Sequence, residues 1–238
     1  MSTHIVVSGG GGFSMSADHR ASAADRFILS LTDKPNPLVC FVPTTSGDNG
    51  LYISQFFNAY SGLGVRTSVL TLWTGAADSI ARMDEADVFI IGGGNTVNLL
   101  ALWSAHGVGD KLRSYTQDQG RDIVIAGNAA GAAALYEACA TDGFGNGISA
   151  LPFGLGLLPG SFCPHYNSEP DRAPRYQQLV DTCALPAGYA VDDAAGIHYL
   201  DGQVQSFWAE RTGAGVYRVE PAENGARISA ETVHPLPS

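Results

Sequence analysis

The chain has 238 residues, of which 45% are hydrophobic and 15% are charged, so general disorder is excluded. It carries 13 basic and 23 acidic residues, and because no basic cluster offsets the net charge of −10, nucleic acid and anionic membrane surfaces are not expected as partners. No apolar run reaches the ~18–20 residues of a membrane helix, and residues 1–4 do not resemble a signal peptide. We therefore expect one domain over residues 1–238, in the cytoplasm, with its four widely spaced cysteines as free thiols and no metal site.

Short apolar runs alternate with amphipathic stretches in the first half of the chain. Five apolar runs are typical of buried strands, over residues 4–8, 38–43, 65–72, 86–91 and 122–126. Helices are predicted between them, over residues 21–31, 50–61, 95–103 and 108–119. Strands separated by helices in this way predict an α/β fold with a mostly parallel sheet and helices on both faces.

The pattern changes after about residue 150. Residues 151–160 are rich in glycine and proline, and residues 169–182 predict one more helix. From Tyr189 onward, short runs separated by turns predict C-terminal antiparallel strands, with a hairpin signal at Asp201-Gly202. Residues 234–238 are expected to form a frayed tail.

Glycines follow two of the predicted strands, at the positions where an open α/β sheet binds its ligands. Gly9–Phe13 follows the first strand, but its spacing does not match a dinucleotide-binding loop, so nucleotide binding is not expected. Gly92-Gly93-Gly94 follows the fourth strand and precedes a helix that Asn95 or Thr96 can cap. The free amides of such a loop indicate an anion or oxyanion site.

The fifth strand is followed by Gly127-Asn128-Ala129-Ala130-Gly131, which has the spacing of a nucleophile elbow. In that motif a sharp turn between a strand and a helix exposes one side chain, and small neighbours let the backbones approach closely. Ala129 occupies the nucleophile position, and an alanine has no hydroxyl group that could attack a substrate. Further along the chain, Asp142, His165 and Asp192-Asp193 are candidate functional groups, each weak when taken alone.

Taken together, these segments resemble the aspartyl dipeptidase (peptidase E) and cyanophycinase family of serine peptidases. The resemblance extends from about His4 to about Glu220. It is carried by the segments Gly9–Phe13, Phe41–Asn49, Ile90–Leu100, Ala126–Ala132, Leu155–Tyr166 and Gly188–Tyr199. It implies a class I glutamine amidotransferase-like fold and a serine peptidase that acts on short peptides and needs no cofactor.

The resemblance implies catalytic roles for individual residues. The family's nucleophilic serine falls at Ala129, and its catalytic histidine falls at His165. Asp193 or Asp142 would orient the imidazole of the histidine, and we slightly favour Asp193.

The resemblance also implies where the substrate is held. The backbone amides of Gly93 and Ala130 would form the oxyanion hole, and Gly94-Asn95 would contact the substrate. An N-terminal acidic side chain on the substrate needs a cation in this acidic protein. Arg172 and Arg175 are candidates, and Arg20 near the first glycine loop is another.

Because the serine is missing, the chain as written should not form an acyl-enzyme. We favour an engineered Ser→Ala replacement, since every other catalytic element is present. The alternatives are a natural pseudoenzyme that binds peptides or small acids, and a different nucleophile at Cys163 or Ser161. An amidotransferase-like enzyme is disfavoured because that class uses an elbow cysteine, and residues 128–130 contain none.

Overall fold

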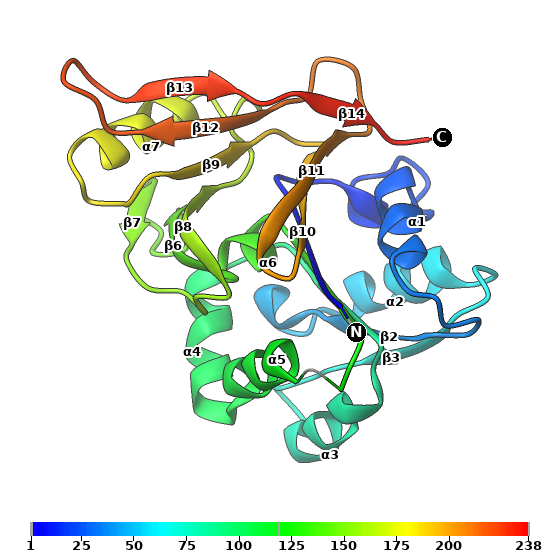
Figure 1. Cartoon of the computed structure of the whole chain (residues 1–238). Helices are drawn as coiled ribbons and strands as arrows, with labels where there is room; N and C mark the ends of the chain where they lie inside the picture. Colours follow the sequence, from blue (N-terminus) through cyan, green and yellow to red (C-terminus); the bar gives the residue numbers. More distant parts are fainter. Residues whose placement is uncertain (1, 119, 238) are drawn as a thin grey trace.

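The computed structural model describes residues 2–118 and 120–237, so the predicted end of a helix at Gln119 and the last tail residue, Ser238, lie outside the described residues. An eight-stranded sheet crosses the molecule in the order β14-β11-β10-β1-β5-β4-β2-β3 (Figure 1). Its strands are β1 (Thr3–Ser8), β2 (Leu38–Val42), β3 (Arg66–Val69), β4 (Val88–Ile91), β5 (Ile123–Asn128), β10 (Ala195–Leu200), β11 (Gln203–Ala209) and β14 (Val233–Pro235).

The first five strands of this sheet run parallel, as the buried apolar runs predict. β10 is antiparallel to β1, and β10 and β11 form the hairpin predicted at Asp201-Gly202. The mostly parallel α/β fold with C-terminal antiparallel strands is therefore confirmed. The expectation of a frayed tail is wrong for His234 and Pro235, because they pair with β11 as part of β14.

Helices cover both faces of the sheet, as predicted. Helices α1 and α2 pack on one face, whereas α3, α4 and α5 pack on the other. None of the helices within residues 2–118 and 120–237 is long and apolar enough to cross a membrane. The bounds are α1 (Ala23–Ser30), α2 (Gly50–Tyr60), α3 (Ala76–Ala81), α4 (Thr96–His106) and α5 (Val108–Gln117).

A second, six-stranded sheet in the order β13-β12-β9-β8-β6-β7 lies beside the first, and the sequence patterns predicted only part of it, namely C-terminal antiparallel strands such as β12. Its strands β6 and β8 are short and contain glutamate, alanine, glycine or proline, so their individual strand propensity is low. β6 pairs with the nearby β7 and with β8, and β8 pairs with β9 across helix α7, so these strands depend on pairing more than on local pattern. The bounds are β6 (Tyr136–Thr141), β7 (Ser149–Leu151), β8 (Leu158–Cys163), β9 (Gly188–Val191), β12 (Val216–Glu220) and β13 (Arg227–Ala230), and helix α7 (Arg172–Asp181) packs against β12.

The two sheets share one buried cluster of apolar side chains. The hydroxyl groups of Tyr136 on β6 and Tyr199 on β10 are 2.7 Å apart, and the ring of Phe162 on β8 stacks on Tyr136 with its centroid 4.9 Å away. This packing fixes the second sheet against the first. The loops after β8 and β9 therefore lie next to the loop after β1.

A histidine pair, buried at His198 and half-buried at His4, joins β1 to β10. His4 Nδ1 lies 2.9 Å from His198 Nε2, and the two rings stack with centroids 5.1 Å apart. Burial lowers the pKa of His198 to about 4, and burial also lowers the pKa of His4 despite nearby carboxylates. The folded chain therefore resists protonation here, whereas the unfolded chain binds protons with an ordinary histidine pKa near 6.5.

We expect this pair to make the folded state less stable in acid. Stability is fully present above about pH 6.5 and falls as the pH drops toward 4, with His198 alone lowering the free energy of unfolding by about 3 kcal/mol. Urea denaturation across this range measures the decline. The His198→Gln variant should show a shallower decline than the parent chain, and equal slopes would contradict the assignment.

Candidate functional site

Ala129 lies at a sharp turn between β5 and the short helix α6 (Ala130–Ala133). Its backbone angles are φ 48° and ψ −108°, a strained conformation for a residue that is not glycine. The turn is held because the Ala129 N–H donates to the Ser8 carbonyl at 3.0 Å. A Cβ on Gly131 would lie 2.5 Å from the Ile91 carbonyl oxygen, so the helix can approach β4 only with glycine there. The chain thus makes the turn that the motif spacing predicts.

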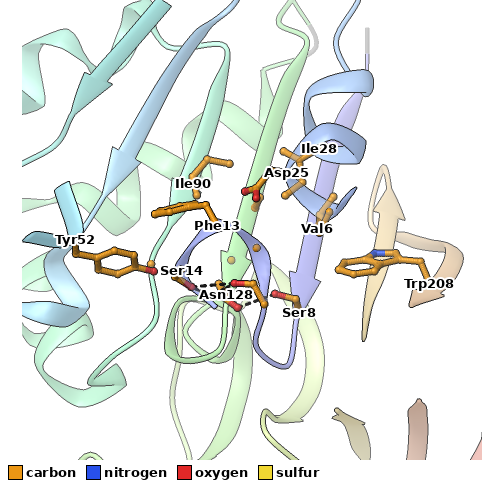
Figure 2. Close-up of a pocket in the computed structure, with 16 residues that line it drawn as sticks. Val6, Ser8, Phe13, Ser14, Asp25, Ile28, Tyr52, Ile90, Asn128 and Trp208 are labelled. Atoms are coloured by element: carbon orange, nitrogen blue, oxygen red, sulfur yellow. Dashed lines mark hydrogen bonds between the residues drawn. The ribbon is translucent and has the colours of Figure 1, made fainter. Parts of the chain in front are cut away.

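The side chain of Asn128 ties this turn to β1 and to the first glycine loop. Its Oδ1 accepts a hydrogen bond from the Ser8 hydroxyl at 2.9 Å, and its Nδ2 donates to the Gly11 carbonyl at 3.3 Å and to the Ser14 hydroxyl at 3.2 Å. Figure 2 shows Asn128 between Ser8 and Ser14, with the Tyr52 ring on the far side of Ser14. Sequence reasoning did not assign a role to Asn128. A polar residue in a turn of small residues is the signal that could have drawn attention to it.

The space that these residues line behind the turn is a narrow crevice of about 30 Å³ (Figure 2). This volume holds one or two water molecules. A peptide needs a larger site.

His165 follows β8 and Asp193 follows β9, and the two side chains form a hydrogen-bonded pair. His165 Nδ1 lies 2.6 Å from Asp193 Oδ1, with side-chain exposures of 25% and 13%. Burial alone would raise the pKa of Asp193, but hydrogen bonds and the neighbouring charges of His165 and Arg211 outweigh it and hold this pKa below its usual value. Asp193 is therefore ionised at neutral pH and accepts the Nδ1 proton of the imidazole.

Gly10 makes room for this pair. A Cβ at this position would lie 2.1 Å from Asp193 Oδ1 and 2.8 Å from His165 Cε1. The backbone of the first glycine loop therefore packs closely against the His165–Asp193 pair.

A cavity of about 200 Å³ opens beside His165. It brings together five of the residues predicted from sequence, namely Gly94, Ala130, Asp142, His165 and Arg172. The remaining lining residues are Thr96, Ala140, Thr141, Pro164 and Glu169. Asp142 lies on the cavity wall with its side chain 63% exposed and its Oδ2 3.7 Å from Arg172, whereas the carboxylate bonded to His165 is that of Asp193.

Two of the predicted arginines have different environments. Arg172 is 3% exposed, and its Nε and Nη2 donate to Glu169 Oε2 at 2.9 and 2.5 Å. Arg175 is exposed and donates to the Ile148 carbonyl at 3.0 Å, so the structure does not bring it to the cavity. Glu169 was missed, although its spacing of three residues from Arg172 at the start of a predicted helix is typical of an ion pair.

Asn95 and Gly93 lie at the edge of the site with their polar groups already engaged. Asn95 caps α4 by accepting the Asn98 N–H at 2.9 Å, and it donates to the Gly143 carbonyl at 3.0 Å, which holds the loop after Asp142. The Gly93 N–H donates to the Tyr52 hydroxyl at 3.3 Å. Both residues thus help to shape the site through these contacts: Asn95 holds the loop after Asp142, and Gly93 is bonded to Tyr52.

The two alternative nucleophiles are buried and do not line the cavity. Burial raises the pKa of the Cys163 thiol far above its ordinary value, which removes the reactive thiolate at neutral pH. The Ser161 hydroxyl donates to the Pro186 carbonyl at 2.6 Å and lies 2.8 Å from the Tyr176 hydroxyl. Their surroundings favour packing roles for both.

A strand-to-helix elbow beside a His–Asp pair, at the ends of parallel strands, is the arrangement of hydrolases that use an elbow nucleophile. A family model described as "Peptidase family S51" matches residues 5–207. The chain is also 41% identical over 221 residues to "Uncharacterized peptidase YgaJ" of Bacillus subtilis (strain 168), covering 92% of this chain and 93% of that protein. The chain belongs to peptidase family S51.

Solved structures share the fold over nearly the whole chain. A peptidase from an acI-B1 Actinobacterium superposes with a TM-score of 0.68 at 15% identity, covering 98% of this chain and 95% of that chain. A putative peptidase E protein from Listeria monocytogenes EGD-e superposes with a TM-score of 0.59 at 14% identity, covering 98% of this chain and 100% of that chain. The resemblance to the peptidase E family and the fold that it implies are confirmed.

Proposed function

We propose that this chain is the scaffold of a serine peptidase that hydrolyses short peptides, and that Ala129 stands where the active enzyme carries its nucleophilic serine. The observation that carries the proposal is the elbow at Ala129, whose next residue, Ala130, lines one cavity with His165 of the His165–Asp193 pair. We infer that Ala129 replaces that serine, by engineering, because the elbow, the histidine and the orienting carboxylate are all retained. Such a change removes the attacking oxygen and leaves the peptide cavity in place.

In the serine form, the hydroxyl oxygen at position 129 attacks the carbonyl carbon of the scissile peptide bond. His165 Nε2 takes the hydroxyl proton and then gives it to the leaving amine. Asp193 keeps the Nδ1 proton in place, so that Nε2 is free to act as the base. Water then hydrolyses the acyl-enzyme by the same proton route, and the mechanism needs no metal or organic cofactor.

The negative charge that develops on the carbonyl oxygen is stabilised by backbone amides at the elbow and in the second glycine loop. The N–H of Ala130 follows the nucleophile position directly and borders the cavity. In the glycine loop, Gly93 and Gly94 are both candidate donors, because a Cβ on Gly93 would lie 3.5 Å from the Ala129 Cβ and Gly94 lines the cavity.

Arg172 supplies the cation that an acidic substrate side chain needs. Its guanidinium borders the cavity and is buried against Glu169, so an acidic group binds it by sharing it with, or displacing, the Glu169 carboxylate. Asp142 borders the same space and completes the polar wall. A cavity of about 200 Å³ suits short peptides better than folded proteins.

In the serine form, Arg172→Gln should reduce the preference for Asp-X over Ala-X dipeptides by about tenfold or more, since a hydrogen bond to a charged group contributes about 1.5–3 kcal/mol. The measurement is the ratio of kcat/KM for the two dipeptides. Arg175→Gln is the matched control, because Arg175 lies outside the cavity lining. A ratio that Arg172→Gln leaves unchanged would contradict the assignment.

The alternative function is a pseudoenzyme that binds peptides or small acids in the same cavity. An assay of the Ala129→Ser variant on a panel of short peptides, with released free amine as the readout, distinguishes the peptidase from the pseudoenzyme. Activity in the serine form supports the peptidase. A folded serine form that binds peptides and cleaves none of them supports the binding protein.

A further inference from the structure

Asp192, the neighbour of Asp193, is a buried carboxylate with four hydrogen-bond donors around it. Asp192 as a whole residue is 5% exposed. Its Oδ1 accepts the backbone N–H of Asn167 at 3.1 Å. Its Oδ2 accepts the Asn167 Nδ2 at 3.1 Å, the Gly215 N–H at 2.9 Å and the Tyr217 hydroxyl at 3.4 Å. The acid–base chemistry described above makes no use of this group.

The donors of Asp192 join the two loops that carry the His–Asp pair. Asn167 lies two residues after His165, and Asp192 lies one residue before Asp193. The backbone adds a further link, because the Tyr166 N–H donates to the Val191 carbonyl at 3.1 Å. The loop after β8 and the loop after β9 are thereby fastened to each other directly beside the 2.6 Å contact between His165 Nδ1 and Asp193 Oδ1.

The backbone at the pair needs such a fastening. His165 has a φ of 55° and Ala194 has a φ of 64°, both in the left-handed region that side chains other than glycine rarely adopt. Strained conformations of this kind persist only where surrounding contacts hold them. Asp192 also binds both backbone polar groups of Gly215. Its carboxylate accepts the Gly215 N–H, and its own N–H donates to the Gly215 carbonyl at 3.0 Å. The anchor thus reaches the start of β12, outside the two loops.

We propose that Asp192 is a positioning residue that sets the hydrogen bond between His165 and Asp193 by clamping their two loops together. The proposal rests on the proposed function for its catalytic consequence, but its structural part does not. Only a carboxylate accepts from all four donors, because an asparagine replaces one acceptor with an NH₂ group. Asp192→Asn therefore keeps the volume of the side chain and loosens the clamp.

The test uses the chain as it is, with Ala129 in place, and reads the imidazole proton that Asp193 holds. A proton in a short hydrogen bond to a carboxylate gives a far-downfield resonance in proton NMR, which the His165→Asn variant assigns by its loss. We expect Asp192→Asn to shift this resonance upfield or broaden it away, while thermal denaturation still shows a folded protein. Asp181→Asn, at the exposed end of α7, is the control and should leave the resonance unchanged.

An unchanged resonance in folded Asp192→Asn would overturn the proposal. Where Asp192→Asn does not fold, Asn167→Ala decides in its place, since Asn167 is exposed and its loss removes one link of the clamp. A shifted or broadened resonance in that variant supports the clamp, and an unchanged one overturns it.

The serine form adds a kinetic readout. Asp192→Asn should lower kcat about 10–100-fold with little change in KM, because misplacement of a catalytic group by about 1 Å costs on the order of 10²-fold. An unchanged kcat in an active serine form overturns the positioning role. A serine form without any activity contradicts the proposed function instead. The NMR test of the clamp is independent of that outcome, because it uses the chain with Ala129 in place.

Discussion

Replacing Ala129 with serine is expected to raise the turnover of short peptides by about 10⁶-fold over the present chain. Loss of the nucleophile in a comparable serine protease costs about this factor, which corresponds to about 8 kcal/mol of activation free energy. The present chain should bind the same peptides with negligible turnover. Release of free amine from Asp-X and other short peptides, measured for both forms under saturating conditions, gives the ratio.

The elbow already has the geometry that a serine requires. Ala129 already has the strained backbone angles of the turn, and Gly127, Ala130 and Gly131 beside it are small. A serine adds one oxygen atom to a residue that is 6% exposed, so little overpacking is expected. The control is His165→Asn in the serine form, which should remove nearly all of the gain. A folded serine form that is as slow as the alanine form would contradict the prediction.

Replacing Asp193 with asparagine in the serine form should lower kcat by about 10⁴-fold, because the amide no longer selects the imidazole tautomer whose Nε2 is a base. The 2.6 Å contact to His165 Nδ1 supports the proposal that Asp193 is the orienting group. Asp142→Asn should act mainly on KM, since Asp142 borders the cavity near Arg172. Steady-state kinetics of both variants decides between the two carboxylates. A larger loss of kcat in Asp142→Asn than in Asp193→Asn would reverse these roles.

Much of the fold could be predicted from local pattern. β2 and β4 are buried along their whole length, so their sequences are continuous apolar runs that have few alternatives to a buried strand. The hairpin of β10 and β11 has its own turn signal. β6 and β8 carry no such local signal, because pairing with distant strands stabilises them, and β14 is fixed by its contact with β11.

The geometry of the candidate site was predictable from sequence where it depends on the spacing of residues along the chain. The elbow around Ala129 is local, so its spacing alone indicates the turn, whereas the pairing of His165 with Asp193 depends on how β8 and β9 pack. Asp142 and Asp193 could not be told apart for this reason. Whether Arg175 points into the cavity depends likewise on how α7 sits on the second sheet, which no local pattern records.

Residue 129 is the proposed nucleophile position, and covalent labelling tests this most directly. The Ala129→Ser variant, the present chain and the Ala129→Ser, His165→Asn double variant are each treated with a fluorophosphonate, which reacts with activated serines. Peptide mass mapping then locates the adduct. We expect a single adduct on residue 129 of the Ala129→Ser variant, no adduct on the present chain, and far slower labelling in the double variant. An adduct on another serine such as Ser161, or labelling at residue 129 that is independent of His165, would contradict this assignment.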